Sequence, residues 1–305
     1  MPRHETTKPS DLSSHYSTMI LICLIWFYSG VGYLELHCDS PAGLNKTTAS
    51  RQSGPGMVER MEVAGRCAVA VVAKAPLPGR SKTRLCPPLR PEQAAALSGA
   101  FLRDMCALVQ EAARLEAMDL FVAYAPAAAT AALTPHVPVE ARLMVATGET
   151  VTEPGVTGFG QVLLETMRGM FALGYGAGCV LNSDSPTLPA AVLARAAREL
   201  REPETAVLGP TGDGGYYLLG LTRPAPSVFA DVAWSTDNVA TRTRQQAAAA
   251  GLRVVTLPTW DDVDDAAGLE ALRRELAAGG AAPATRVALT AMGLLDAARL
   301  ETGEV

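Results

Sequence analysis

The sequence predicts an α/β protein, a three-layer α/β/α sandwich around a mostly parallel sheet. Three observations predict this fold. Residues 67–73 form an uninterrupted apolar run, which is typical of a parallel strand buried on both faces. Short apolar runs of this kind then alternate with apolar stripes at helical spacing, and Pro and Gly separate the two kinds of segment. This alternation favours a doubly wound sheet within one domain.

The same patterns place each element in order along the chain. Strands are expected at residues 67–73, 119–124, 141–145, 178–181, 206–208, 216–219 and 253–257. Helices are expected at residues 91–115, 127–133, 158–172, 190–200, 238–250, 266–278 and 287–299. The first of these helices carries an apolar stripe at Leu97, Phe101, Met105, Leu108 and Leu115.

Composition is that of an ordinary globular protein and excludes several classes. Hydrophobic residues make up 49% of the chain and charged residues 19%. The net charge of -5 includes no long block of one sign, which argues against a nucleic-acid partner. The 6 cysteines include no Cys-x-x-Cys pair, so neither a zinc site nor a disulfide framework is predicted. Reduced thiols and a cytoplasmic location are the expectation.

The first 56 residues differ from the rest of the chain. Their apolar run, residues 19–28 with a weak continuation to Leu34, is short for a membrane span of about 20 residues. Our interpretation is an N-terminal extension with a non-native or mis-assigned start; the alternative is a membrane anchor, and membrane contact is expected only in that case. The main domain is then expected at residues 57–279, followed by a helical tail at residues 280–305.

The loop that follows the first strand, residues 74–85, is a candidate phosphate site. Ligands in open α/β sheets bind beyond the carboxyl ends of the strands, where this loop is expected. The loop opens with Lys74, Gly79 permits close backbone approach, and Lys82 and Arg84 supply positive charge. A solvated basic turn is the alternative. The spacing lacks the Gly-x-x-x-x-Gly-Lys-Ser/Thr pattern of a P-loop, which disfavours a Walker-type NTPase.

Two acidic segments are candidates for binding Mg²⁺ or Mn²⁺. Asp184 follows the strand at residues 178–181, and hard divalent cations prefer such oxygen ligands. Its alternative role is a turn before the next helix. Asp262 and Asp264 are two residues apart, so in an extended segment they point the same way and can share one cation. The alternative, a helix N-terminus that favours acidic residues, suits Asp264 and Asp265.

A Gly-rich turn at residues 209–215 is a candidate substrate site. Gly214 and Gly215 permit close approach of a substrate, Tyr216 follows them, and Asp213 is a candidate base or hydroxyl-orienting group. A hairpin turn needs Asp-Gly equally, and that alternative stays open. Farther along, Ser235 or Thr236 is expected to cap the next helix.

Histidine is informative because so little of it is present. Beyond the N-terminal extension the sequence contains only His136, which lies between prolines. A Ser-His-Asp or Cys-His nucleophilic mechanism is therefore not expected. Catalysis would depend on positioning, a metal ion and fixed charge.

Five segments taken together resemble one family. They are residues 74–85, 183–189, 209–221, 234–236 and 262–265. Their order and spacing resemble the DUF2064 family of GT-A-like glycosyltransferases, over residues 67–275. The chain is similar in turn to nucleotidyltransferases of the 2-phospho-lactate guanylyltransferase type, which share a Lys-Ser/Thr-Arg-Leu loop, an Asp-x-Pro strand end and an Asp-x-Asp. Asn182 stands where such proteins often have Gly.

The resemblance implies a GT-A, Rossmann-like nucleotide-binding catalytic domain. It implies phosphate contacts for the basic side chains of the first loop, metal binding by the three aspartates of the acidic segments, and an acceptor facing Asp213 and Tyr216. The expected function is metal-dependent transfer from a nucleotide-activated sugar to a small-molecule acceptor. The alternatives are a nucleotidyltransferase that joins an NTP to a phosphorylated small molecule with release of pyrophosphate, and a nucleotide-binding module without catalysis.

Overall fold

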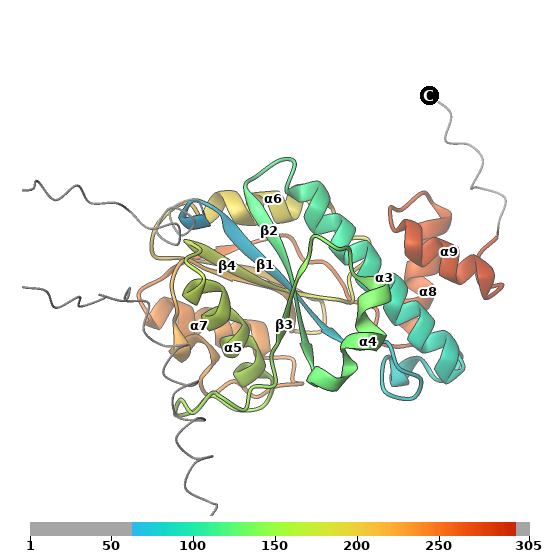
Figure 1. Cartoon of the computed structure of the whole chain (residues 1–305), viewed down its shortest axis with the longest axis horizontal. Helices are drawn as coiled ribbons and strands as arrows, with labels where there is room; N and C mark the ends of the chain where they lie inside the picture. The colour runs from blue at the N-terminus through green and yellow to red at the C-terminus, as the bar shows by residue number, and fades with distance from the viewer. Residues whose placement is uncertain (1–62, 297–305) are drawn as a thin grey trace, which may run out of the picture. The chain divides into compact units, whose positions relative to one another are not determined.

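The structure, a computed structural model, describes residues 63–296. Its centre is a seven-stranded sheet, of which Figure 1 labels β1 to β4; the strand order is β3-β2-β1-β4-β6-β5-β7. The strands are β1 (Cys67–Lys74), β2 (Met118–Ala125), β3 (Arg142–Val145), β4 (Ala177–Asn182), β5 (Thr205–Pro210), β6 (Tyr216–Leu221) and β7 (Arg253–Thr256). β6 runs antiparallel to both of its neighbours, and all other pairs are parallel. The predicted α/β class with a mostly parallel sheet is therefore confirmed.

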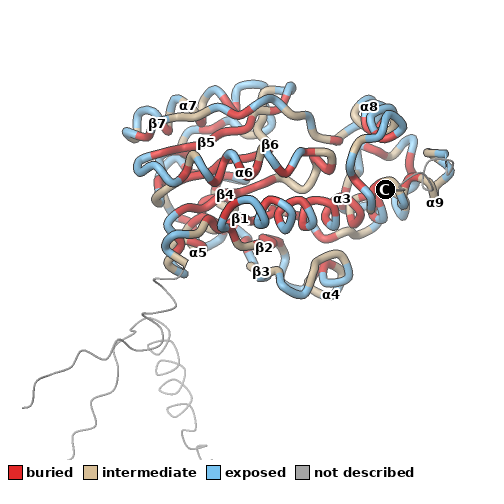
Figure 2. The backbone as a smooth tube through the Cα atoms, turned by 90° about the horizontal axis from the view of Figure 1, so that it is seen from above, coloured by how far each residue is buried: buried red, intermediate tan, exposed pale blue. Residues whose placement is uncertain are grey.

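Helices cover both faces of this sheet. The helices of the described part are α3 (Pro91–Ala112), α4 (Thr130–Leu133), α5 (Phe159–Ala172), α6 (Ala190–Glu199), α7 (Val239–Ala249), α8 (Ala266–Ala277) and α9 (Pro283–Ala291). Of these, α8 and α9 do not lie on the sheet but pack with one end of α3. Short 3-10 helices occur at η1 (Thr83–Leu85), η2 (Ala127–Ala129), η3 (Thr134–His136) and η4 (Pro226–Phe229). In Figure 2 the buried residues follow the strands and the inner sides of the helices, as the three-layer arrangement requires.

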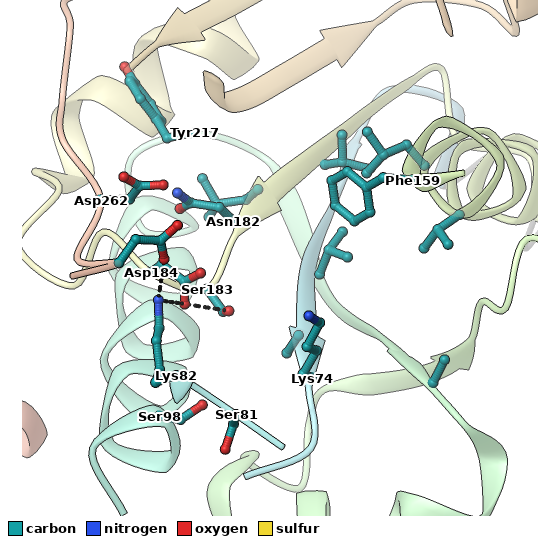
Figure 3. A pocket seen from close by; sticks show the side chains of 18 of the residues that line it. Lys74, Ser81, Lys82, Ser98, Phe159, Asn182, Ser183, Asp184, Tyr217 and Asp262 are labelled. Carbon is teal, nitrogen blue, oxygen red and sulfur yellow. Dashed lines mark hydrogen bonds and ion pairs between the residues drawn. The ribbon is translucent and has the colours of Figure 1, made fainter. Parts of the chain in front are cut away.

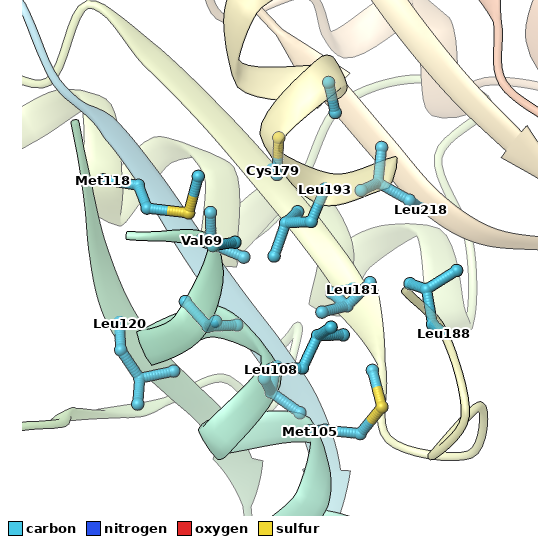
Figure 4. Packing of buried hydrophobic residues seen from close by; sticks show 14 of the residues in the cluster. Val69, Met105, Leu108, Met118, Leu120, Cys179, Leu181, Leu188, Leu193 and Leu218 are labelled. Carbon is cyan, nitrogen blue, oxygen red and sulfur yellow. The ribbon is translucent and has the colours of Figure 1, made fainter. Parts of the chain in front are cut away.

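The alternation of side chains along β1 divides the core into two layers. Val69 and Val71 pack with α3 and α6, and Figure 4 shows Val69 in this layer with Leu108 and Leu193. Ala68 and Ala70 face the opposite way and pack with α5 and α7. The run at residues 67–73 is apolar throughout because both of its faces are covered.

Strand register brings the loops of the first half together at one edge. Lys74, the last residue of β1, pairs with Ala125 at the end of β2, and Val72 pairs with Asn182 at the end of β4. Because β6 is antiparallel to β4, its first residue Tyr216 starts from this same edge. The loops after β1 and β4 and the turn before β6 therefore meet beyond the carboxyl ends of the parallel strands.

The C-terminal helix differs from the prediction in its position. A helix was expected at residues 287–299, whereas α9 spans Pro283–Ala291, and residues 297–299 lie outside the described part. Pro283 suits the first turn, and the buried Asp104 of α3 accepts hydrogen bonds from the backbone N–H groups of Ala284 and Thr285, at 2.9 and 2.7 Å. This long-range cap, which local periodicity does not reveal, sets the start of α9.

The first helix is shorter than predicted. α3 ends at Ala112, and Leu115, which was expected to complete its apolar stripe, is exposed. At the other end of α3, Leu97 and Phe101 pack with Leu269 of α8 and Leu289 of α9 in a third apolar cluster. Residues of the expected C-terminal tail therefore contribute to the packed core of this part of the chain.

Two expectations concern the chain's surroundings. Within residues 63–296, no helix is both long enough and apolar enough to cross a membrane. The apolar run at residues 19–34 and the expected extension at residues 1–56 lie outside the described part. The four cysteines of the described part are free thiols.

Candidate functional site

A cavity of about 680 Å³ opens beyond the carboxyl ends of β1 and β4. Figure 3 shows Lys82, Asp184 and Asp262 at one end of it and Phe159 at the other. The charged end is lined by Arg80, Lys82, Thr83, Arg84, Ser183, Asp184, Asp262 and Asp264. The apolar end is lined by Val72, Ala125, Ala146, Phe159, Val162 and Leu163. One cavity thus joins an acidic and basic cluster to an apolar recess.

Lys82 lies at the centre of the charged end. Its ammonium Nζ is 2.9 Å from Oδ1 of Asp184 and 2.8 Å from Oδ1 of Asp264. It also donates to the backbone carbonyl of Val263, at 2.8 Å. An ammonium has three N–H donors, so these three acceptors account for all of them. The side chain is only 7% exposed, which rules out the solvated basic turn that the sequence left open for this residue.

The two carboxylates keep Lys82 charged despite its burial. Burial is the largest effect on its pKa and lowers it, but the attraction of Asp184 and Asp264 outweighs that effect and raises the pKa. The residue stands in the left-handed region, with φ of 49°, directly before η1. This backbone conformation is uncommon for a non-glycine residue. The side chain that leaves it reaches Val263 and Asp264, which lie 181 and 182 residues farther along the chain.

The predicted metal ligands come together at this end. The backbone carbonyl of Asp184 accepts the N–H of Val263 at 2.9 Å, which holds the loop after β4 against the acidic segment. The Ser183 hydroxyl donates to Oδ1 of Asp184 at 2.9 Å. Among residues 63–296, however, no three His, Cys, Asp or Glu side chains form a ready-made metal-binding group. Instead, the Lys82 ammonium occupies the space between Asp184 and Asp264.

Burial and neighbouring carboxylates both act on the carboxyl group of Asp262. Burial raises its pKa to about 7, together with the charges of three neighbouring carboxylates. These carboxylates are Asp264, Asp213 and Asp184. Lys82 also faces Asp262 and lowers its pKa, but this opposing effect is the smallest of the five. The attraction of Lys82 therefore does not outweigh these effects on the pKa of Asp262.

Asp264 and Asp265 take different roles, which separates the two interpretations of the acidic segment. Oδ1 of Asp265 accepts the backbone N–H of Gly268 at 2.9 Å and caps α8. Asp264 instead contacts Lys82, and its second oxygen lies 3.7 Å from Arg84. The helix-terminus role therefore belongs to Asp265, while Asp264 faces the cavity.

The remaining residues of the first loop divide into two groups. Lys74 and Arg84 line the cavity, and the Arg84 side chain is 70% exposed, so its guanidinium is available to a ligand. Arg80 lines the cavity as well, although the sequence gave no reason to prefer it. Gly79 does not line the cavity; its φ of 71° shows that it serves the turn itself.

The Gly-rich turn is mainly a structural hairpin. Asp213, Gly214 and Gly215 do not line the cavity, whereas Tyr216 does, as predicted. Oδ1 of Asp213 accepts the Thr211 hydroxyl at 2.5 Å and the Gly215 N–H at 3.0 Å, and these bonds lower its pKa, although burial opposes them. The Asp213 carboxylate is exposed, and its charge acts on Asp262 and is attracted by Arg84. It therefore borders the charged end.

Replacing Gly214 with Ala tests the packing role of this turn. Its φ is +91°, and an added Cβ would lie 2.0 Å from the carbonyl oxygen of Asp237. We expect Gly214→Ala to lower the free energy of unfolding by about 2 kcal/mol or more, measured by denaturant titration. The matched variant Gly251→Ala, at φ +80° with open space around the new Cβ, should cost only about 1 kcal/mol. Equal losses of unfolding free energy in the two variants would show that the close approach to Asp237 adds nothing to the cost of Gly214→Ala.

Phe159 and Ser235 also line the cavity, although neither was predicted as a site residue. Phe159 starts α5, is 48% exposed and contacts Trp234 edge to face, with ring centroids 5.5 Å apart. Ser235 lines the cavity with φ of 64°, a strained conformation for serine. The predicted capping was wrong: α7 begins at Val239, and the Thr236 hydroxyl donates to the carbonyl of Ala233 instead. The Trp-Ser-Thr motif at residues 234–236 was the signal available in the sequence.

His136 has no part in this cavity. Its Nδ1 lies 2.7 Å from Arg103, and burial followed by the charge of that arginine lowers its pKa. The described residues lining the cavity include no histidine.

Comparison with protein families gives one match. Residues 108–236 match the family described as "Uncharacterized protein conserved in bacteria (DUF2064)". The predicted resemblance is confirmed. The matched range contains Asp184 and the Gly-rich turn, whereas the first loop and the acidic segment at residues 262–265 fall outside it. No match was found among the curated proteins.

Solved structures resemble the chain over most of its length. One is described as a "putative nucleotide-diphospho-sugar transferase" from Desulfovibrio desulfuricans G20; it is 29% identical, with a TM-score of 0.62, over 75% of this chain and 96% of that one. A nucleotidyl transferase from Methanothermobacter thermautotroptrophicus is 15% identical, with a TM-score of 0.43, over 69% and 97%. CMP:2-keto-3-deoxy-manno-octonic acid synthetase complexed with CTP is 13% identical, with a TM-score of 0.41, over 70% and 99%. The description of the first of these structures agrees with the predicted transferase class.

Proposed function

We propose that the chain is a metal-dependent glycosyltransferase that uses a nucleotide-activated sugar donor. The observation that carries this proposal is the single cavity in which Asp184, Asp264 and Lys82 meet an apolar recess at Phe159. Such a donor has both matching parts, a charged diphosphate and a flat base. The structure described as a "putative nucleotide-diphospho-sugar transferase", which is 29% identical to this chain, supports the same class.

The chain's own residues fit a divalent cation in their chemistry. Asp184, Asp262 and Asp264 offer the hard oxygen donors that Mg²⁺ and Mn²⁺ prefer. Burial and the neighbouring carboxylates raise the pKa of Asp262, and a cation bound beside it would favour its charged form. A bound cation would stabilise the charge that develops on the diphosphate leaving group.

The basic residues of the cavity would bind the phosphates of the donor. The exposed guanidinium of Arg84 can grip phosphate oxygens through two N–H groups, and the exposed Lys74 ammonium lies at the end of β1. Asp213, bordering the charged end, would orient an acceptor hydroxyl, and Tyr216, which lines the cavity, would face the acceptor. Together these groups position the reactants without a histidine.

Replacing Phe159 with Ala tests the apolar recess. An exposed aromatic ring lining a cavity can stack on a nucleobase, and one such contact contributes about 1–3 kcal/mol. We expect Phe159→Ala to weaken binding of a nucleoside diphosphate about tenfold or more in titration calorimetry. Leu173→Ala is the control, because Leu173 is equally exposed, at 45%, at the other end of α5 and does not line the cavity. If both variants weaken nucleoside diphosphate binding equally, the nucleobase does not bind in this recess.

Nucleotidyl transfer is the second candidate, and the absence of histidine from the described cavity lining favours it. A phosphate monoester has a second pKa of about 6, so at pH 7 it is already largely a dianion and needs no general base to attack an NTP. In that reaction the same basic residues would bind a triphosphate, and pyrophosphate would leave.

The two transfers, and binding without catalysis, differ in their products. The full-length protein with Mg²⁺ or Mn²⁺ is incubated with panels of nucleoside-diphosphate sugars, NTPs and acceptors, and released nucleoside diphosphate and pyrophosphate are quantified. We expect nucleoside diphosphate that depends on a sugar acceptor. Pyrophosphate that depends on a phosphorylated acceptor would replace the first candidate with the second. A nucleotide-dependent rise in melting temperature with neither product would leave a binding module.

A further inference from the structure

The proposed metal ligands and the buried lysine use the same oxygen atoms. Lys82 Nζ contacts Oδ1 of Asp184 and Oδ1 of Asp264, and both carboxylates line the cavity where a cation would bind. These are the shortest ion-pair contacts that either carboxylate makes among the described residues. A divalent cation and this ammonium therefore compete for one place.

With its contacts to Asp184, Asp264 and Val263, the Lys82 ammonium is not free to bind a phosphate. All three of its donors are taken, the third by the carbonyl of Val263, and the ring of Phe101 lies 5.6 Å from its Nζ. To bind a phosphate, Lys82 must give up at least one carboxylate. That loss leaves a partly buried negative charge without its partner, unless another cation replaces the ammonium.

We propose that the Lys82 ammonium is a built-in substitute for the cation, which holds Asp184 and Asp264 together in the nucleotide-free protein and must leave them before a divalent cation binds. The inference rests on the proposed function, because it concerns the same metal site. It assigns Lys82 a role that the sequence did not suggest, since the first-loop pattern predicted only a phosphate contact.

A coupling between ligands follows from this exchange. Nucleotide phosphates offer the displaced ammonium a new partner, and the vacated carboxylates offer the cation its ligands. Each ligand then favours binding of the other, as any linked pair of equilibria requires. The nucleotide-free protein should bind divalent cations weakly, because there the ammonium has nowhere to go.

Removal of the lysine should therefore strengthen cation binding. Binding of Mn²⁺ to the nucleotide-free, full-length protein is measured from the electron paramagnetic resonance signal of free Mn²⁺, for wild type, Lys82→Met and Lys74→Met. We expect Lys82→Met to bind Mn²⁺ about tenfold tighter than wild type or more, within the usual range of such couplings. Lys74→Met removes the same charge from the same cavity but no carboxylate contact, so we expect a change of about threefold or less.

The outcomes separate this inference from the proposed function. If Lys82→Met binds Mn²⁺ no tighter than Lys74→Met while all three proteins bind it in the presence of a nucleoside diphosphate, the inference is wrong and the metal site stands. If none of the three proteins binds Mn²⁺ even with a nucleoside diphosphate present, both this inference and the proposed metal site are wrong. Should Lys82→Met unfold without metal, circular dichroism is recorded with millimolar Mn²⁺; recovery of the fold supports the exchange, and failure to recover contradicts it.

Discussion

Replacement of Asp184 with Asn is expected to slow transfer by about 10³-fold, whichever of the two products the protein makes. Asp184 lies where β4 ends, faces the cavity and is fixed by Ser183 and by the backbone of Val263. Stabilisation of developing charge by a bound metal is worth several kcal/mol, and about 1.4 kcal/mol corresponds to a factor of ten in rate. The measurement is the initial rate of product release at saturating donor and metal.

Asp265→Asn provides the matched control for this loss. It removes one carboxylate charge from the neighbouring acidic segment, but its side chain caps α8 and does not line the cavity. We expect about 1 kcal/mol or less of lost stability from the weakened cap and little change in rate. Similar rate losses in both variants would show a general effect of charge and would contradict a specific role for Asp184.

Replacement of Lys82 with Met is expected to lower the free energy of unfolding by about 2 kcal/mol. Removing one partner of a buried ion pair costs about 3–5 kcal/mol. The side chains of Asp184 and Asp264 are 28% and 42% exposed, so water screens part of the charge left behind and reduces that cost. Chemical denaturation of the metal-free protein measures the change.

Two further variants check the origin of this loss. Lys74→Met removes an exposed charge and should change stability by about 0.5 kcal/mol or less. Adding Asp264→Asn to Lys82→Met removes one of the unpaired carboxylates, so the double variant should be more stable than Lys82→Met alone. A double variant that loses the sum of both single effects would mean that the two side chains do not interact.

Local sequence patterns were sufficient for most of the fold. The apolar run of β1 indicated a strand with both faces covered, and its residues do divide between two core layers. Because parallel strands end at one edge, the pattern also placed the loop after β1 beside Asp184. The start of α9 was missed because the buried Asp104 that caps it is 180 residues away.

The sequence placed several candidate site residues at one edge of the sheet but did not reveal their contacts. Lys82, Asp184 and Asp264 were each assigned to the right edge, but no pattern in the sequence shows that the lysine reaches across 182 residues to a carboxylate. The sequence pattern suggested a substrate contact for Gly214. Its packing against Asp237 was not foreseen, because local patterns do not show which distant residues pack together. Phe159 was missed because a single aromatic residue at a helix start carries no local signal.

The position of the cation tests the account most directly. Crystals of the full-length protein grown with Mn²⁺ and a nucleoside diphosphate would be measured for anomalous scattering. We predict a manganese peak coordinated by Asp184 and Asp264, with the Lys82 ammonium no longer in contact with both carboxylates. Nucleotide bound in the cavity with no peak at these carboxylates, and with Lys82 still bridging them, would contradict the account.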